Sequence, residues 1–251
     1  MAAASWRAVT ARAWPASADA DAQVFVEDLA APVLQPADAH HLVRVLRLRQ
    51  GAVVVAADGH GRWRRCRLDT AGPALRADGP VAEVPAARPA ITVAFVPVKG
   101  DRPEWVVQKL TELGVDRIVV LRSARAVVRW DRDTAHGERA VDRLRKVAAA
   151  AAAQCRRPDL PEVEGLWDLD RLVAQAPGAI GLADPGGDPP SLALPTVAVG
   201  PEGGWTDAER AAVGRRRVGL GPTILRAETA AVTVGAILCA LRGGIVAQGG
   251  E

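Results

Sequence analysis

The pattern of apolar and polar residues changes at the proline-rich segment 84–89, which divides the chain into two regions. In the first region, apolar and polar residues alternate in short runs, and turn-forming residues such as Asp58-Gly59-His60-Gly61 separate the runs. This alternation predicts β-strands of a small barrel, with one short helix over about 37–46 before the second strand. The predicted strands cover residues 23–27, 51–57, 62–68 and 80–84.

The second region combines continuous apolar runs with helical segments. Asp101 and Pro103 predict the start of a helix that Gly114 ends, and Thr206 with Glu209 forms the T-x-x-E pattern of a capped helix start. Because strands and helices alternate, this region is predicted to be an α/β domain with a parallel sheet. The predicted domains are therefore residues 1–86 and 87–251. The expected strands cover 91–98, 117–121, 179–183 and 196–199, and the further helices cover 134–154 and 228–241.

The composition excludes several classes of protein. With 251 residues, 49% hydrophobic and 24% charged, the chain is long and apolar enough to bury a core and is not a disordered protein. Three cysteines stand far apart without a C-x-x-C pair, and four histidines lack the spacing of metal ligands. We therefore expect no disulfide framework, no metal site, and a reducing, cytoplasmic location.

Neither end of the chain predicts a membrane segment. Residues 1–18 are rich in alanine and arginine and contain no acid, as transit peptides do, but they have no apolar core, which favours a simple extension. The longest apolar stretch, 230–241, is interrupted by Thr233 and is shorter than the ~20 residues that a helix needs to span a bilayer.

The positive charge is informative through its position rather than its total. The formal net charge is only +3, and an arginine excess with just three lysines fits the codon usage of a GC-rich genome. Residues 40–67, however, contain seven arginines and one acid, Asp58, and residues 117–157 contain eleven basic residues and four acids. Either stretch alone fits a solvated face, but two of them with Trp63 nearby favour structured RNA as the partner. The candidate RNA-binding residues are Arg44, Arg47, Arg49, Arg62, Arg64, Arg65, Arg122 and Arg125.

Two segments could bind a small ligand. Gly200-Pro201-Glu202-Gly203-Gly204 lies between a buried strand and a capped helix, so it fits either a ligand-binding loop or a tight turn, with Trp205 as a possible wall of a pocket. It matches neither G-x-G-x-x-G nor a Walker A loop. In the second segment, 220–230, Arg226 and Glu228 stand at the start of the last helix. Glu228 fits a helix cap, whereas Arg226 suits a carboxylate or phosphate.

Taken together, the motifs resemble the 16S ribosomal RNA (uracil-1498-N3) methyltransferase family, which belongs to the SPOUT methyltransferases. The resemblance extends over nearly the whole chain. It rests on four groups of residues in the same order: His40-His41-Leu42 with Val45-Leu46-Arg47-Leu48; Lys99-Gly100-Asp101 with Gln108-Lys109-Leu110-Thr111-Glu112-Leu113-Gly114-Val115; Gly200-Pro201-Glu202-Gly203-Gly204; and Leu220-Gly221-Pro222 with Leu225-Arg226-Ala227-Glu228-Thr229-Ala230.

The resemblance implies an α/β fold in which a small PUA-like β-barrel precedes a SPOUT trefoil-knotted parallel-sheet domain. The knot would form where the segment 196–241 threads a loop, a rare arrangement among folds. The resemblance further implies that S-adenosylmethionine binds between the two glycine turns, that the protein is a homodimer with the pocket at the subunit interface, and that the substrate is 16S rRNA in the small ribosomal subunit. The implied cofactor-binding residues are Leu182, Gly200, Pro201, Gly203, Gly204, Leu220, Gly221, Ile224, Leu225 and Thr229.

The chemistry of uracil suggests roles for three residues. Because N3 of uracil carries a proton, methylation requires a base and a group that stabilises the negative charge that develops. We expect Arg226 to stabilise that charge, and Glu228 or Glu202 to act as base or organiser. Two alternatives stay open at this point: a SPOUT enzyme that methylates another base or a ribose 2′-hydroxyl, and a non-enzymic RNA-binding assembly factor.

Overall fold

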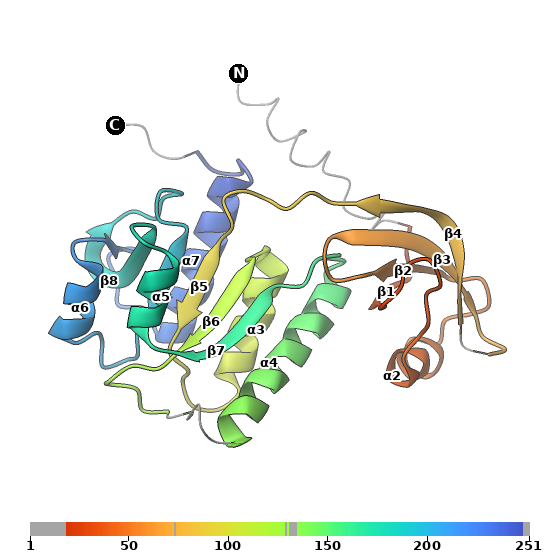
Figure 1. The fold of residues 1–251 in the computed structure, drawn as a ribbon, viewed down its shortest axis with the longest axis horizontal. Helices are drawn as coiled ribbons and strands as arrows, with labels where there is room; N and C mark the ends of the chain where they lie inside the picture. Colours follow the sequence, from red (N-terminus) through yellow and green to blue (C-terminus); the bar gives the residue numbers. More distant parts are fainter. Residues whose placement is uncertain (1–18, 73, 129, 131–134, 248–251) are drawn as a thin grey trace. The chain divides into compact units, whose positions relative to one another are not determined.

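The computed structural model describes residues 19–72, 74–128, 130 and 135–247, which form two compact units (Figure 1). The first unit consists of residues 1–86 with 149–160, and the second of residues 87–148 with 161–251. The predicted N-terminal extension, residues 1–18, lies outside the described residues. Within the described part of the chain, no helix combines the length and the apolar character that crossing a membrane requires.

The first unit contains a four-stranded sheet in the order β1-β2-β3-β4. Strands β1 and β2 pair in parallel, and the other neighbours pair antiparallel. The last strand is longer than the expected 80–84: it begins at Ala74, after the turn that follows β3, and continues through Pro80. Its pairing with β3 shifts register between Arg64 and Cys66. The strands are β1 (Ala22–Phe25), β2 (Val53–Ala57), β3 (Arg62–Asp69) and β4 (Ala74–Glu83).

A short helix precedes β2, as the sequence predicted, but its two halves differ. The first half is the α-helix α2 (Pro36–His40), and the second is the π-helical turn η1 (His41–Val45), after which the Leu46 N–H donates to the His41 carbonyl over 2.9 Å. Leu42 on this turn is fully buried in the core of the unit. The turn therefore holds its polar and basic residues outward while it anchors one leucine.

The second unit is built on a six-stranded sheet in the order β10-β8-β9-β5-β6-β7, in which every neighbouring pair is parallel. The predicted parallel sheet is thus confirmed, and the strands at 117–121 and 196–199 have the predicted bounds. The six strands are β5 (Thr92–Phe95), β6 (Arg117–Leu121), β7 (Glu162–Trp167), β8 (Ile180–Asp188), β9 (Thr196–Val199) and β10 (Arg217–Val218).

Helices cover both faces of this sheet (Figure 1). Side chains alternate along β5, so that Val93 and Phe95 pack with α3, α4 and α7, whereas Ala94 packs with α5 and α6 on the other face. Gly114, with a φ of 91°, ends α3 as predicted. The helices are α3 (Arg102–Leu113), α4 (Ala135–Gln154), α5 (Leu169–Gln175), α6 (Asp207–Val213) and α7 (Ala227–Arg242).

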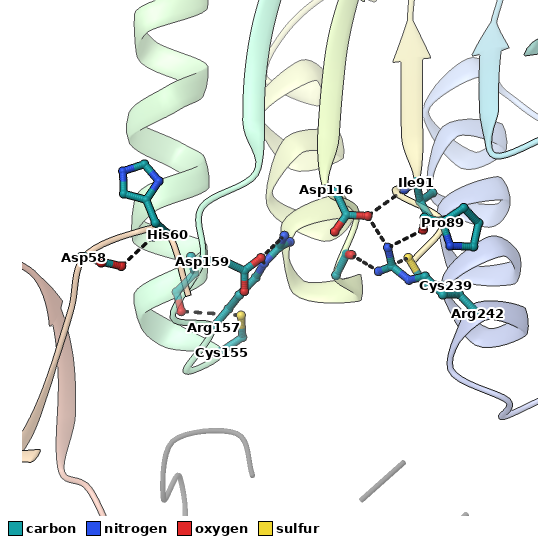
Figure 2. Close-up of polar contacts among 12 residues, drawn as sticks. Asp58, His60, Pro89, Ile91, Asp116, Cys155, Arg157, Asp159, Cys239 and Arg242 are labelled. Carbon is teal, nitrogen blue, oxygen red and sulfur yellow. Dashed lines mark hydrogen bonds and ion pairs between the residues drawn. The ribbon is translucent and has the colours of Figure 1, made fainter. Parts of the chain in front are cut away.

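The C-terminal end of α7 is fixed to the ends of the sheet by Arg242 (Figure 2). Its guanidinium forms an ion pair with Asp116 and donates hydrogen bonds to the carbonyls of Gly114 (2.7 Å) and Pro89 (3.2 Å). The same Asp116 carboxylate accepts from the Ile91 N–H at 2.7 Å. These contacts fix α7, whose N-terminal end carries Glu228, against β5 and β6.

The capping box at the start of α6 is present as predicted. The Thr206 hydroxyl accepts from the Glu209 N–H (3.2 Å), and the Glu209 carboxylate accepts from the Thr206 N–H (2.7 Å). Glu209 also accepts from the Ser123 hydroxyl at 2.8 Å and from the Ala124 N–H at 3.3 Å. Burial raises the pKa of Glu209, but these accepted hydrogen bonds outweigh it and leave the pKa below its ordinary value.

A Glu209→Gln variant should therefore lose stability in a pH-dependent way. Because the folded state lowers the pKa, the ionised carboxylate adds stability above the unfolded-state pKa of 4.5, and this contribution fades as the pH falls through the folded-state pKa. We expect the variant to be less stable by about 1 kcal/mol at pH 7 and to approach the parent protein in acid. Urea unfolding across this pH range measures the difference; a deficit that stays constant with pH would contradict the expected role of the carboxylate.

Candidate active site

A cavity opens at the carboxyl ends of the parallel strands β9 and β10, the usual position of ligand sites in α/β folds. The two glycine segments identified in the sequence both contribute to its wall. The cavity together with the open space at its mouth encloses about 740 Å³. It is lined by residues 183–185, 199–202, 204–205, 218, 220–221, 223–225, 227 and 230.

The first glycine loop is shaped by Trp205. The Trp205 side chain is only 1% exposed, and its indole N–H donates to the Ala183 carbonyl on β8 at 3.2 Å. A Cβ atom on Gly200 would lie 2.9 Å from Cε2 of Trp205, so only glycine fits at this position. Trp205 therefore forms a wall of the cavity, as the sequence suggested, and Gly200 provides the room for it.

Arg125 and Arg210 hold the end of the same loop. Arg125 donates to the carbonyls of Gly203 (3.0 Å) and Trp205 (3.3 Å), and Arg210 donates to the Trp205 carbonyl at 2.8 Å. Arg210 also pairs with Asp184, whose carboxylate lines the cavity, at 3.0 Å. Backbone and side-chain contacts thus fix the loop before any ligand binds.

The second glycine loop begins where two backbones touch. The Gly219 N–H donates to the Asp188 carbonyl at 2.8 Å, and a Cβ on Gly219 would lie 2.4 Å from the Gly187 carbonyl oxygen. Further along, Gly221 has a φ of 124°, a conformation that favours glycine. The path of this loop beside β8 therefore depends on the absence of side chains.

A Gly219→Ala variant should be destabilised by about 1–3 kcal/mol, because its Cβ meets backbone that cannot rotate away. Gly72→Ala is the matched control, since a Cβ there meets nothing within 4 Å. Denaturant unfolding of both variants checks the prediction. Equal stability of the two variants would mean that the close backbone contact is not required.

Most of the predicted cofactor-binding residues lie in this cavity, and three do not line it. Leu182 is fully buried within β8, where it pairs with Ala198 of β9, and Gly203 and Thr229 are exposed outside the lining. The seven that line the cavity are Gly200, Pro201, Gly204, Leu220, Gly221, Ile224 and Leu225.

The two predicted carboxylates meet at Arg102, the first residue of α3. Arg102 Nη1 lies 3.3 Å from Oε1 of Glu228 and 4.0 Å from Oε1 of Glu202. The Glu228 side chain is 12% exposed, and its Oε2 is buried without a hydrogen-bond partner among the described residues. The Glu202 side chain is 61% exposed and lines the cavity. Arg226 is exposed at the N-cap of α7, outside the lining.

Sequence reasoning missed Arg102 and Asp184 as residues of this site. Asp184 follows the predicted strand 179–183, and a carboxylate at the carboxyl end of a parallel strand is a recognisable signal. Arg102 follows the Lys99-Gly100-Asp101 motif directly, but nothing in its local sequence places it beside Glu228, 126 positions later.

The candidate RNA-binding arginines differ in how far the protein itself uses their charge. Arg64 donates to the carbonyls of Gly79 (2.7 Å) and Leu29 (2.8 Å), and Arg65 pairs with Asp78 at 3.2 Å. Arg62 forms a longer ion pair with Asp58, at 4.0 Å. One nitrogen of Arg122 donates to both carboxylate oxygens of Asp168, at 2.8 and 2.9 Å. Arg44, Arg47 and Arg49, on and after η1, are exposed and form no ion pair with a described residue.

Comparison with known proteins places this geometry in context. A family model described as an RNA methyltransferase domain matches residues 86–239, and an RNA methyltransferase PUA domain matches residues 34–73. The chain is similar to ribosomal RNA small subunit methyltransferase E of Mycobacterium bovis (36% identical; 83% of this chain and 86% of the relative) and of Bacillus subtilis (30%; 77% and 83%). It also resembles a solved Legionella pneumophila protein in complex with the bound cofactor SAM (26% identical, TM-score 0.70; 87% and 96%).

The fold and the paired domains define the class: an α/β methyltransferase domain of the SPOUT type that follows a PUA-like domain. The fold class implied by the sequence motifs is thereby confirmed. The chain belongs to the RNA methyltransferase family that includes ribosomal RNA small subunit methyltransferase E.

Proposed function

We propose that the protein transfers a methyl group from S-adenosylmethionine to N3 of a specific uridine in the 16S rRNA of the small ribosomal subunit, in the cytoplasm. The observation that carries this proposal is the cavity between the two glycine loops, with the Arg102–Glu202–Glu228 cluster beside it. Family membership supports the reaction class and the names of the relatives support the RNA substrate. The choice of N3 rests on the chemistry of the cluster and on the motif resemblance.

The residues of the cavity fit S-adenosylmethionine. Gly200 and Gly221 let a ligand approach the backbone, while Val199, Leu220 and Leu225 offer apolar walls. Asp184 provides a carboxylate at one side. When bound, S-adenosylmethionine supplies a methyl group that is attached to a positively charged sulfur. As the methyl group is transferred, the electron pair of the carbon–sulfur bond stays on the sulfur, and the rest of the cofactor leaves as a neutral thioether.

The carboxylates have different surroundings, which support different roles. Glu202 is accessible and lines the cavity, so we assign it the role of the base that accepts the N3 proton of uracil. Glu228 is mostly buried and faces Arg102, so we assign it the role of organiser. Arg226, exposed between two lining residues, is proposed to stabilise the negative charge on the uracil oxygens during the transfer.

The first unit is proposed to bind the rRNA through its exposed arginines. Arg44, Arg47 and Arg49 lie on and after η1, where the described residues give them no ion pair. Unpaired guanidinium groups bind well to the phosphates of an RNA backbone. Arg64, in contrast, already donates hydrogen bonds to carbonyls of its own unit.

We also propose that the protein works as a homodimer. Ile224 lines the cofactor cavity and yet is 82% exposed, so a second copy of the chain could cover it and complete the wall. Sedimentation analysis tests this point, and a monomer at micromolar concentration with full activity would contradict it.

Incubation of unmethylated small subunits with S-adenosylmethionine tests the proposed reaction. A methyl group on N3 blocks base pairing, so reverse transcription of the rRNA should stop at a single uridine only after the incubation. Methyl incorporation without such a stop favours a ribose 2′-hydroxyl target, and no incorporation favours a non-enzymic assembly factor. Faster methylation of naked rRNA than of subunits would contradict a folded ribonucleoprotein as the substrate.

A further inference from the structure

A second cavity in the same unit adjoins the cofactor cavity. The two cavities share Pro201 and Glu202 of the first glycine loop as a common wall. The rest of the second cavity comes from the segment between β5 and α3 and from the loop after β6. Its lining residues are Pro97, Val98, Lys99, Arg102, Val127, Pro201 and Glu202.

The walls of this cavity combine apolar surface with two cations. Pro97, Val98 and Val127 offer surface on which a planar ring can pack, and Lys99 and Arg102 are positively charged. Apolar surface combined with cations suits a nucleotide, whose base is planar and whose phosphate is an anion.

The two cations are not equally available. Arg102 lies between the carboxylates of Glu228 and Glu202, at 3.3 Å and 4.0 Å, so its charge is balanced within the protein. Lys99 is exposed, and its ammonium has neither an ion pair nor a hydrogen bond with any described residue. Of the two cations, Lys99 is therefore the one whose charge is free to bind an anion that enters the cavity.

The Arg102–Glu202 pair suits the pairing edge of uracil. That edge presents one N–H donor, N3, between two carbonyl acceptors, and a guanidinium beside a carboxylate offers the complementary donor and acceptor. Glu228 contacts Arg102 from the buried side, so it fixes the direction of the guanidinium.

We propose that this second cavity holds the target uridine, with Lys99 on a neighbouring phosphate and Arg102 oriented by Glu228 toward the base. The inference rests on the proposed function, because it places the substrate beside the bound cofactor. Enzymes that modify a base in structured RNA must take it out of its stack, and the shared wall at Glu202 would put the displaced base next to the cofactor cavity. Glu228 is thus a positioning residue.

Three variants test the site with unmethylated small subunits as substrate. Lys99→Gln should raise KM for the subunits about tenfold and reduce the slope of log KM against log salt by about one, the effect of losing one phosphate contact. Lys109→Gln is the matched control, because Lys109 is paired with Glu112 on the same strand–helix unit. Val127→Trp should fill the cavity and abolish methylation at subunit concentrations that saturate the parent enzyme.

Binding of S-adenosylmethionine, measured by calorimetry, separates this inference from the proposed function. All three variants should bind it with the affinity of the parent protein, because Lys99, Lys109 and Val127 do not line the cofactor cavity. An unchanged salt slope for Lys99→Gln, or full activity of Val127→Trp, would overturn the second cavity as the uridine site. If the parent enzyme itself transfers no methyl group to the subunits, the proposed function fails instead.

Discussion

A Glu202→Gln variant is expected to transfer methyl groups about 10²- to 10⁴-fold more slowly than the parent protein, the usual contribution of a general base. Glutamine keeps the size of the side chain and can donate a hydrogen bond, but it cannot take the N3 proton. Because the Glu202 side chain is 61% exposed, its replacement should leave the fold intact. Single-turnover transfer to unmethylated small subunits, at saturating S-adenosylmethionine, measures the rate.

Variants of three other residues complete the comparison, two that should slow the reaction and one control. Glu228→Gln and Arg226→Ala should also slow the reaction, Glu228→Gln through the orientation of Arg102 and Arg226→Ala through lost charge stabilisation. Glu138→Gln, at an exposed glutamate of α4 away from both cavities, should be unaffected. If folded Glu202→Gln turned over at nearly the parent rate, the assignment of Glu202 as base would be wrong.

Replacing Gly200 by alanine should weaken S-adenosylmethionine binding by roughly 10- to 100-fold. The added Cβ would lie 2.9 Å from Cε2 of Trp205, an indole that is 1% exposed and hydrogen-bonded to β8, so the loop must move instead. Overpacking of this kind costs about 1–3 kcal/mol, and movement of the loop changes the wall that the cofactor contacts.

Gly72→Ala is again a suitable control, since it adds the same methyl group where a Cβ meets nothing within 4 Å. Calorimetry should show a loss of affinity only for Gly200→Ala, and thermal unfolding should show whether the loop transmits the strain to the sheet. Parent-like affinity and parent-like thermal stability for Gly200→Ala would together show that the packing of Trp205 does not shape the site.

The elements that could be predicted from the sequence are those with a strong local pattern. The strands at 117–121 and 196–199 are buried on both faces, so their apolar runs are continuous and their bounds came out correctly. The capping box at Thr206 and the helix end at Gly114 depend only on local chemistry and were likewise predictable.

The missed elements lack such a pattern. Strand β7 (Glu162–Trp167) lies at the edge of the sheet and carries Glu162 and Glu164, which pair with Arg117 of β6, so its sequence is not continuously apolar. The following helix α5 has only seven residues, too few for a clear helical period. In the first unit, the predicted strand covered 80–84, whereas β4 begins at Ala74 and passes through Pro80 near a register shift.

The site could be predicted only in part, for a similar reason. The two glycine loops are contiguous motifs, and most of their residues line the cofactor cavity. Arg102 joins the site only because packing of α3 against α7 brings it to Glu228, and no local signal encodes that proximity. The second cavity likewise combines 97–102, 127 and 201–202, three separate parts of the chain.

Analysis of the nucleoside product tests the central claim most directly. Unmethylated small subunits are incubated with the protein and S-adenosylmethionine, their 16S rRNA is digested to nucleosides, and the methylated product is identified by mass and chromatographic standards. The cavity and its carboxylates predict 3-methyluridine, at no more than one residue per 16S rRNA. A 2′-O-methyl nucleoside, a methylated base other than uracil, or no methylated product would contradict the account.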